Sequence, residues 1–371
     1  MLITGLLSSC TTPTENPSFR ILAFGTYIDV TLSDVTPDQV ATARQYLEQD
    51  FAAMQQAWHA WEPGPVGRIN QLIRAGSPPF AAPPSVLPLL RRAQQLAAQS
   101  DYLFDPGIGQ LIALWGFQGK ARSQPPPGDQ IQAWLKSRPS IQNITLDKLY
   151  LSSDNPRVQL DFGAIGKGYG ISQAIQRLRS LGIKNAIVNA GGDLQAIGTN
   201  RGHPWRIAIR DPRGIPDRIL GTLSVSDNAA VFTSGNYERH FTWQGKRYHH
   251  ILDPRTGYPA AGLSSVTVLS QDATLADAAA TALLIAGPDD WPHIAQQMGI
   301  EAALVVNAQG HIQLTPAMQQ HLTLSQSSAP ILTHPHPMSA SHSAKHSHPF
   351  SRPNLVSRQI ITRHFEHNRA Q

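Results

Sequence analysis

The chain has 371 residues, of which 41% are hydrophobic, 15% charged and 7% aromatic. This composition is typical of a folded globular protein, and it excludes collagen, a coiled coil and a wholly disordered chain. The formal net charge is +5, but residues 326–371 hold five Lys and Arg against one Glu and so carry +4 of it. The rest of the chain is nearly neutral, which argues against nucleic acid as a partner.

The single cysteine, Cys10, excludes an internal disulfide and a multi-cysteine zinc site. It follows an apolar run, Met1 to Leu7, and two serines, and it precedes a polar stretch. This order resembles a bacterial lipobox, whose cysteine is lipidated. We therefore expect a lipoprotein leader and linker at 1–17, with its natural start upstream of Met1, and a lipid anchor to the membrane on the periplasmic face. The alternative is an incidental cysteine.

The first part of the chain predicts one strand followed by helices. Arg20 to Leu32 is rich in β-branched and aromatic residues, as strands are, with Gly25 at a bend. Thr36-Pro37 opens a long helical pattern that ends near His59. Further helices are expected at 68–74, 83–100 and 108–115. The proline-rich stretch 125–128 is expected to form a surface loop or small insertion.

From Ile141 the pattern changes to short strands around a helix that runs from about Ala164 to Leu181. Strands are expected at 186–188, 205–210, 220–226, 229–233, 240–243, 248–252, 264–269 and 302–306. Two more helices are expected at 275–286, which stops at Gly287-Pro288, and 290–298. This mixture predicts an α+β fold, a single compact domain over 18–325 of mixed helices and largely antiparallel sheet.

The tail 326–371 is rich in Ser, Pro and His and poor in apolar residues. Such a segment cannot bury a core, so we expect it to be disordered. Metal scavenging by its histidines is the alternative.

A glycine-rich segment, Asp161 to Gly170, connects a predicted strand to a predicted helix. The context suits phosphate binding by backbone N–H groups at a helix start. The glycine spacing matches neither a P-loop nor a dinucleotide fingerprint, so a tight helix entry remains an equal alternative. A second glycine turn, Asn189 to Asp193, allows a ligand to approach the backbone or is a plain turn between strands.

Asp277 and Thr281 lie four residues apart in an alanine-rich helix and therefore share one face. A carboxylate and a hydroxyl are the oxygen ligands that Mg²⁺ prefers. The alternative is an Asp favoured by the helix dipole and a Thr that bonds back to a carbonyl. His250 precedes an Asp-Pro turn, where it is either structural or a general base beside acids and hydroxyls.

The order of these segments resembles the ApbE family, the FAD:protein FMN transferases. Seven blocks carry the resemblance: 24–26, 104–106 with 114–117, 161–170, 189–193, 233–237, 250–257 and 276–282. It implies Mg²⁺-dependent cleavage of FAD, with FMN passed to a Thr or Ser hydroxyl of an acceptor flavoprotein and AMP released. The implied acceptors are flavoprotein subunits of respiratory electron-transport complexes.

The resemblance also assigns residues. The implied metal ligands are Asp277, Thr281 and the backbone carbonyl of Ala164, and His250 accepts the acceptor's hydroxyl proton. The implied flavin contacts are Phe24, Trp61, Leu103, Phe104, Asp105, Asp161, Lys167 and Leu252. Three positions depart from the family pattern: Phe24 replaces Met, Trp61 replaces Tyr, and Ala280 replaces an acid beside the metal, which weakens a two-metal proposal. FAD hydrolysis and flavin binding without turnover remain as alternative functions.

Overall fold

The computed structural model describes residues 15–119, 122–215 and 218–325. Cys10 and the tail 326–371 lie outside these ranges, so the predicted lipid anchor and the predicted disordered tail stay predictions. Within the described ranges, no helix is long and apolar enough to cross a membrane.

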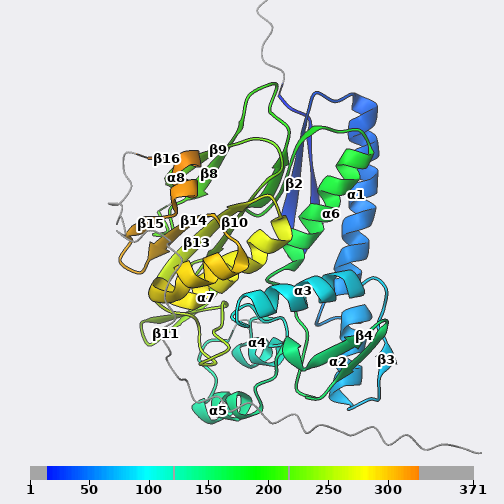
Figure 1. The fold of residues 1–371 in the computed structure, drawn as a ribbon, viewed down its shortest axis with the longest axis vertical. Helices are drawn as coiled ribbons and strands as arrows, with labels where there is room; N and C mark the ends of the chain where they lie inside the picture. The colour runs from blue at the N-terminus through cyan, green and yellow to red at the C-terminus, as the bar shows by residue number, and fades with distance from the viewer. Residues whose placement is uncertain (1–14, 120–121, 216–217, 326–371) are drawn as a thin grey trace, which may run out of the picture. The chain divides into compact units, whose positions relative to one another are not determined.

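An eight-stranded sheet in the order β1-β2-β6-β7-β10-β13-β14-β15 forms the centre of the fold (Figure 1). Each neighbouring pair is antiparallel. The strands are β1 (Ser18–Ala23), β2 (Thr26–Ser33), β6 (Asn185–Ala190), β7 (Asp193–Ile197), β10 (Ala229–Gly235), β13 (Leu263–Ser270), β14 (Ala302–Asn307) and β15 (Ile312–Leu314). The predicted α+β class with largely antiparallel sheet is confirmed.

The predicted strand over 20–32 is a hairpin of two strands instead. Ala23 pairs with Thr26, so Phe24 and Gly25 form a two-residue turn. Both have positive φ, 54° and 70°, as a type I′ hairpin turn requires. The expected bend at Gly25 is therefore a full chain reversal, and it brings Phe24 to the end of the sheet.

Eight α-helices surround this sheet in the described ranges. They are α1 (Pro37–Trp58), α2 (Pro65–Arg74), α3 (Leu87–Gln99), α4 (Gly109–Trp115), α5 (Gly128–Ser137), α6 (Gly166–Ser180), α7 (Ala273–Met298) and α8 (Pro316–His321), with a short 3₁₀ turn η1 (Ile141–Asn143). Figure 1 shows α6 and α7 lying across the sheet, with α1 beside α6. Thr36 and Gln39 cap the start of α1 reciprocally.

The stretch 273–298 holds two helices that meet at a kink, as the sequence predicted, and they share the label α7. Gly287 has φ of 84° within α7, and Pro288 follows it. The proline lacks an N–H and the glycine leaves the helical region, so the first helix ends where the sequence predicted a stop. The first half of α7, which carries Asp277 and Thr281, is almost wholly buried.

Three smaller sheets complete the fold. Their orders are β16-β9-β8, β3-β5-β4 and β11-β12. Their strands are β3 (Phe80–Ala81), β4 (Ile144–Asp147), β5 (Tyr150–Ser153), β8 (Trp205–Arg210), β9 (Ile219–Val225), β11 (His240–Trp243), β12 (Lys246–His249) and β16 (Leu322–Leu324). All their pairings are antiparallel.

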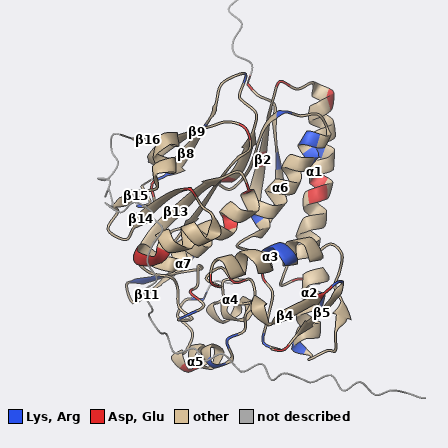
Figure 2. Ribbon diagram, viewed as in Figure 1, with Lys and Arg blue, Asp and Glu red and all other residues tan. Residues whose placement is uncertain are grey.

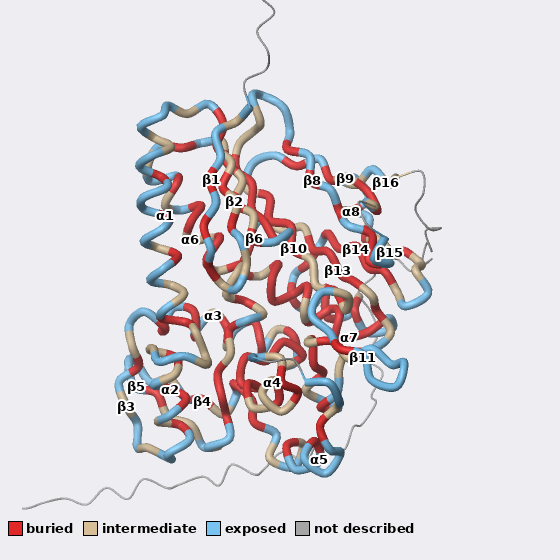
Figure 3. Tube along the Cα trace, turned by 180° about the vertical axis from the view of Figure 1, so that it is seen from behind, coloured by how far each residue is buried: buried red, intermediate tan, exposed pale blue. Residues whose placement is uncertain are grey.

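The main hydrophobic core lies between the large sheet and the helices α1, α3, α6 and α7. A second core joins the opposite face of the sheet to β8, β9 and α8. Figure 3 shows buried chain through the sheet and α7, whereas much of α1 is exposed along its outer face. A third, smaller cluster surrounds Trp115.

Candidate active site

A charged cluster forms where the start of α6 meets β7 and α7. Lys167, in the first turn of α6, makes an ion pair with Asp193 at the start of β7. The other oxygen of Asp193, Oδ1, accepts the backbone N–H of Thr233 at 2.8 Å. Asp277 of α7 accepts the backbone N–H of Gly168 at 2.8 Å. Three elements that are distant in sequence therefore bring two carboxylates to one lysine.

The electrostatics of this cluster are set by burial. Burial raises the pKa of Asp277 to about 7, with Lys167 opposing the rise and Asp193 adding to it. Burial lowers the pKa of Lys167, but Asp193 and Asp277 together raise it above its ordinary value. Two carboxylates thus share one ammonium group, and Asp277 lacks a cation of its own among the described residues.

The predicted metal ligands fit an oxygen-binding cation. Thr281 lies one turn after Asp277, and its Oγ1 is 3.1 Å from Oγ of Ser234 on β10. Ala164 is four residues before Gly168 in the turn that leads into α6, so the chain keeps it close to the Gly168–Asp277 contact. In the described ranges, this site included, no group of three or more His, Cys, Asp or Glu could hold a metal ion. The donor set is therefore one carboxylate, hydroxyl groups and backbone carbonyls.

Two glycines of the segment 161–170, Gly168 and Gly170, allow close packing at the helix entry. A Cβ on Gly168 would lie 2.3 Å from the carbonyl oxygen of Ala273 and 2.7 Å from Cβ of Asp277. A Cβ on Gly170 would lie 2.6 Å from the ring of Phe24. Tight packing at the helix entry accounts for both glycines, and this close approach is what brings Lys167 beside Asp277.

Phe24 is half-buried at the end of the sheet, beside the first turns of α6. Its ring stacks on Trp58 at 5.9 Å between centroids and meets Phe51 edge-on at 5.8 Å. Its backbone N–H donates to Gln55 Oε1 at 2.7 Å. The structure thus places Phe24 within an aromatic group near the glycine-rich segment.

A second group of predicted residues lies along the strand-like segment before α6. The indole N–H of Trp61 donates to Asp161 Oδ2 at 2.9 Å, across 100 residues of sequence. The backbone N–H of Asp161 donates to the carbonyl of Pro106 at 2.8 Å. The structure therefore brings Trp61, Asp161 and the segment 103–106 together, and the chain continues from them directly to Lys167.

Leu103, Phe104 and Asp105 are all buried. Oδ1 of Asp105 accepts the N–H of Gly107 at 2.7 Å and that of Ile141 at 2.9 Å. Burial raises the pKa of Asp105 to about 6, although these bonds oppose the rise. Asp105 thus connects its own loop to the start of η1 at Ile141, a structural role that the sequence did not indicate.

His250 follows β12 and is partly exposed. Its Nδ1 lies 3.2 Å from the carbonyl of Arg239. Burial of the ring, with further contributions from Arg239, His249 and Lys167, lowers the pKa of His250 to about 3. The influence of Lys167 places His250 beside the charged cluster. Leu252 is buried in the cluster around Trp115.

Three contributors had no predicted role. Asp193 belongs to the glycine turn at 189–193. The acid that follows two glycines was the sequence feature that could have indicated a role in the site. Ser234 lies within a matching block. Arg255 donates to the carbonyl of Ile285 at 2.9 Å and to Asp253 Oδ2 at 3.0 Å, so it fastens the turn after His250 to α7, and no sequence pattern indicated this contact.

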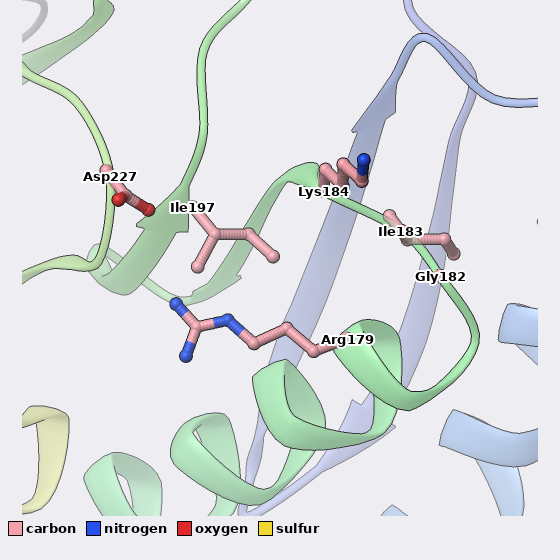
Figure 4. A pocket seen from close by; sticks show the side chains of 6 residues that line it. All are labelled: Arg179, Gly182, Ile183, Lys184, Ile197 and Asp227. Carbon is pink, nitrogen blue, oxygen red and sulfur yellow. The ribbon is translucent and has the colours of Figure 1, made fainter.

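A pocket among the described residues lies away from this cluster. It has a volume of about 260 Å³ and sits where α6 ends (Figure 4), with its lining formed by Arg179, Gly182, Ile183, Lys184, Ile197 and Asp227. About twelve residues of helix, or about 18 Å, separate it from Lys167. It contains none of the predicted site residues, so the chemistry of the side chains, rather than cavity size, defines the candidate site.

Comparisons with known proteins agree with this fold. The model of the ApbE family matches residues 24–304, and the chain therefore belongs to the ApbE family. It is similar to the FAD:protein FMN transferase of Rhodobacter capsulatus, 39% identical over 323 residues, which cover 87% of this chain and 61% of that protein. It is also similar to the FAD:protein FMN transferase of Vibrio cholerae, 34% identical over 65% of this chain and 72% of that protein.

Solved structures give the same result. The ApbE protein of Thermotoga maritima superposes with a TM-score of 0.74 at 32% identity, covering 83% of this chain and 99% of that one. The apo flavinyl transferase ApbE of Pseudomonas stutzeri gives 0.71 at 28% identity, covering 84% and 98%. The family resemblance in the sequence is confirmed. The chain spans about three fifths of the Rhodobacter relative's length.

Proposed function

We propose that this chain transfers FMN from FAD to a threonine or serine hydroxyl of an acceptor flavoprotein, with Mg²⁺ as cofactor and AMP as the second product. Its membership of the ApbE family and the named activity of its relatives support the transfer. The observation that carries the proposal is the buried carboxylate of Asp277, which faces Lys167 with Thr281 one turn away.

Asp277, Thr281 and the carbonyl of Ala164 would hold the metal. The donor set consists of hard oxygen ligands, and the raised pKa of Asp277 reflects a buried charge that a cation would stabilise. Bound there, Mg²⁺ would neutralise the pyrophosphate, whose charge otherwise repels an oxygen nucleophile.

Lys167 contributes a fixed positive charge. An ammonium group has three donors, and the ion pair with Asp193 orients it at the start of α6. We assign Lys167 to the phosphate oxygens of FAD. Trp61, with its N–H bound to Asp161, offers an aromatic surface for the flavin ring.

His250 is neutral at physiological pH and so has a lone pair to accept a proton, although its lowered pKa makes it a weaker base than an ordinary histidine. The carbonyl of Arg239 accepts from Nδ1, which leaves Nε2 with a free lone pair. The acceptor hydroxyl loses its proton to Nε2 and its oxygen bonds to the FMN phosphorus. The bond from that phosphorus to the bridging oxygen breaks, and AMP leaves with that oxygen.

One assay tests the activity. Purified protein is incubated with FAD, Mg²⁺ and a candidate acceptor domain. Covalent flavin fluorescence on a denaturing gel supports transfer. Free FMN and AMP would instead identify a hydrolase, and intact bound FAD would identify a flavin-binding protein.

For the cellular setting, we propose a lipid anchor on Cys10 at the periplasmic face and respiratory flavoprotein subunits as acceptors. The lipobox-like order around Cys10 supports the anchor. Mass spectrometry of membrane-extracted protein tests it, since an unmodified Cys10 would contradict the anchor.

A further inference from the structure

The β11–β12 hairpin projects directly from the candidate site. Arg239 precedes β11 and His250 follows β12, and the N–H of His250 donates to the carbonyl of Arg239 at 3.0 Å. Arg239 and Lys167 both lower the pKa of His250. Ser234, whose Oγ lies 3.1 Å from Oγ1 of Thr281, is only five residues before Arg239. The chain therefore keeps the base of the hairpin close to the candidate site.

The hairpin is well anchored on one face. Phe241 and Tyr248 pair across the strands, stack at 5.4 Å and pack against Trp115 at 6.3 and 5.6 Å. Gln244 and Gly245 form its turn with φ of 48° and 76°, as a type I′ turn requires. Among the described strands, β11 and β12 pair only with each other, so the outer edge of each strand is open.

The hairpin is basic. Residues 239–252 contain Arg239, Lys246 and Arg247 and no acid, and the acids Glu238 and Asp253 flank this stretch at the base of the hairpin. All three basic side chains are exposed. Figure 2 shows Lys and Arg colouring on the hairpin beside the label β11, and β12 supplies Lys246 and Arg247 because β11 itself has neither residue type. Arg247 pairs with Thr242 on the face opposite Phe241 and Tyr248, so it points away from the aromatic anchor.

We propose that this hairpin is the docking surface for the acceptor protein, and that it takes an extended segment with acidic residues beside its threonine or serine. The inference rests on the proposed transferase function. An acceptor hydroxyl has to reach Nε2 of His250, and an open strand edge that ends at His250 guides an extended segment there through main-chain hydrogen bonds. Glu238 lies beside Arg239 at the base of the hairpin, so the net positive charge belongs to Lys246 and Arg247 near its turn. These two charges favour acidic side chains and disfavour basic ones.

Labelled peptides test the docking surface on the intact protein. Two peptides share a central threonine and differ only in their flanking residues, which are Asp and Glu in one and Asn and Gln in the other. Fluorescence anisotropy gives the Kd of each. We expect the acidic peptide to bind at least about tenfold more tightly at low salt, with the difference shrinking as ionic strength rises.

Charge reversal then locates the surface. Lys246→Glu with Arg247→Glu is expected to weaken acidic-peptide binding at least about tenfold and to leave the Kd for FAD, read from flavin fluorescence, within about twofold. The single variant Arg247→Glu has a matched control in Arg206→Glu, an exposed arginine on β8, which is expected to change nothing.

Each other outcome overturns the proposal. Equal binding of the two peptides would show that the hairpin does not select charge. An equal loss in the Arg206→Glu control would show a general charge effect. A parallel loss of FAD affinity would assign the hairpin to FAD, and loss of binding to anionic vesicles without loss of peptide binding would assign it to the membrane. Failure of the proposed transferase function is read separately, as absence of AMP release from FAD by the unaltered protein.

Discussion

The backbone N–H of Gly168 lies 2.8 Å from Oδ2 of Asp277, which joins α6 to α7 across 109 positions of sequence. This bond needs the two helices closer together than any side chain at 168 would permit, because a Cβ there would overlap the backbone of α7. Lys167 is the residue directly before Gly168, so this glycine also sets the distance between Lys167 and Asp277.

Gly168→Ala is expected to separate the helices and to lower the free energy of unfolding by about 1–3 kcal/mol, the usual cost of overpacking. Denaturant unfolding measures it. Gly166→Ala is the matched control, because no atom lies within 4 Å of a Cβ at Gly166. It is expected to be neutral or stabilising by about 0.4–1 kcal/mol, and equal losses in both variants would show that the Gly168 contact has no special role.

Asp277→Asn is expected to reduce FMN transfer at least about 100-fold while FAD affinity falls far less, because the carboxylate acts mainly on the transition state. Gel fluorescence and flavin titration give the two quantities. Asp277→Ala is expected to behave alike. Near-normal Mg²⁺-dependent transfer in both variants would place the metal elsewhere and leave α7 as a packed helix.

Asp105 is expected to make stability fall as pH rises. Its folded pKa of about 6 lies above the ordinary value of 3.8, so the folded protein binds the proton more tightly than the unfolded chain. The contribution is complete below about pH 4 and is lost as pH rises through 6, by on the order of 1–3 kcal/mol.

Asp105→Asn retains an oxygen for the N–H groups of Gly107 and Ile141 and removes the titration. The difference in unfolding free energy between the unaltered protein and this variant is expected to change between about pH 4 and 7. Asp147→Asn, at an exposed position on β4, serves as the control. A pH-independent difference for Asp105→Asn would mean that the carboxyl group does not titrate in this range.

His250→Gln is expected to lower the transfer rate about 10²–10⁴-fold, as removal of a general base does. His293→Gln, at an exposed position on α7, controls for the loss of a histidine. Since the pKa of His250 is lowered to about 3, kcat/KM of the unaltered protein should show no acidic limb assignable to this residue between about pH 5 and 8. A limb in that range that His250→Gln abolishes would contradict the lowered pKa.

Much of the fold could be predicted because its local signals are strong. Thr36-Pro37 marks the start of α1, and Gly287-Pro288 marks the kink of α7. The prediction of a single strand over 20–32 was wrong. A type I′ turn needs only two residues, and Phe24 is an unusual residue at positive φ, so the sequence gives little sign of the turn. Helix α5 begins directly after the prolines at 125–127, where the sequence favoured a loop. Strand β7 is buried on both faces and so lacks the alternation that identifies strands.

The site was predictable only within single elements. Four-residue spacing places Asp277 and Thr281 on one helix face without knowledge of the fold. The partnership of Lys167 with Asp193, and that of Trp61 with Asp161, depend on how the sheet and helices pack, and sequence spacing carries no such information. Arg255 illustrates the same limit, because its contact with the carbonyl of Ile285 exists only where α7 bends.

The pairing of β2 with β6 exposes this chain to aggregation while it is being synthesised. Ser33 lies opposite Asn185 in the sheet, so all of 34–184 is inserted between neighbouring strands. On a ribosome, the β1–β2 hairpin waits on the order of ten seconds for its partner, with an apolar, unpaired edge that can join another nascent chain. Pairings of such separation also slow folding, because the long loop is closed before its contacts stabilise it. The protein is therefore most prone to aggregate during synthesis, before β6 has paired with β2. In the finished sheet β2 is enclosed between β1 and β6, and this edge is no longer available to another chain.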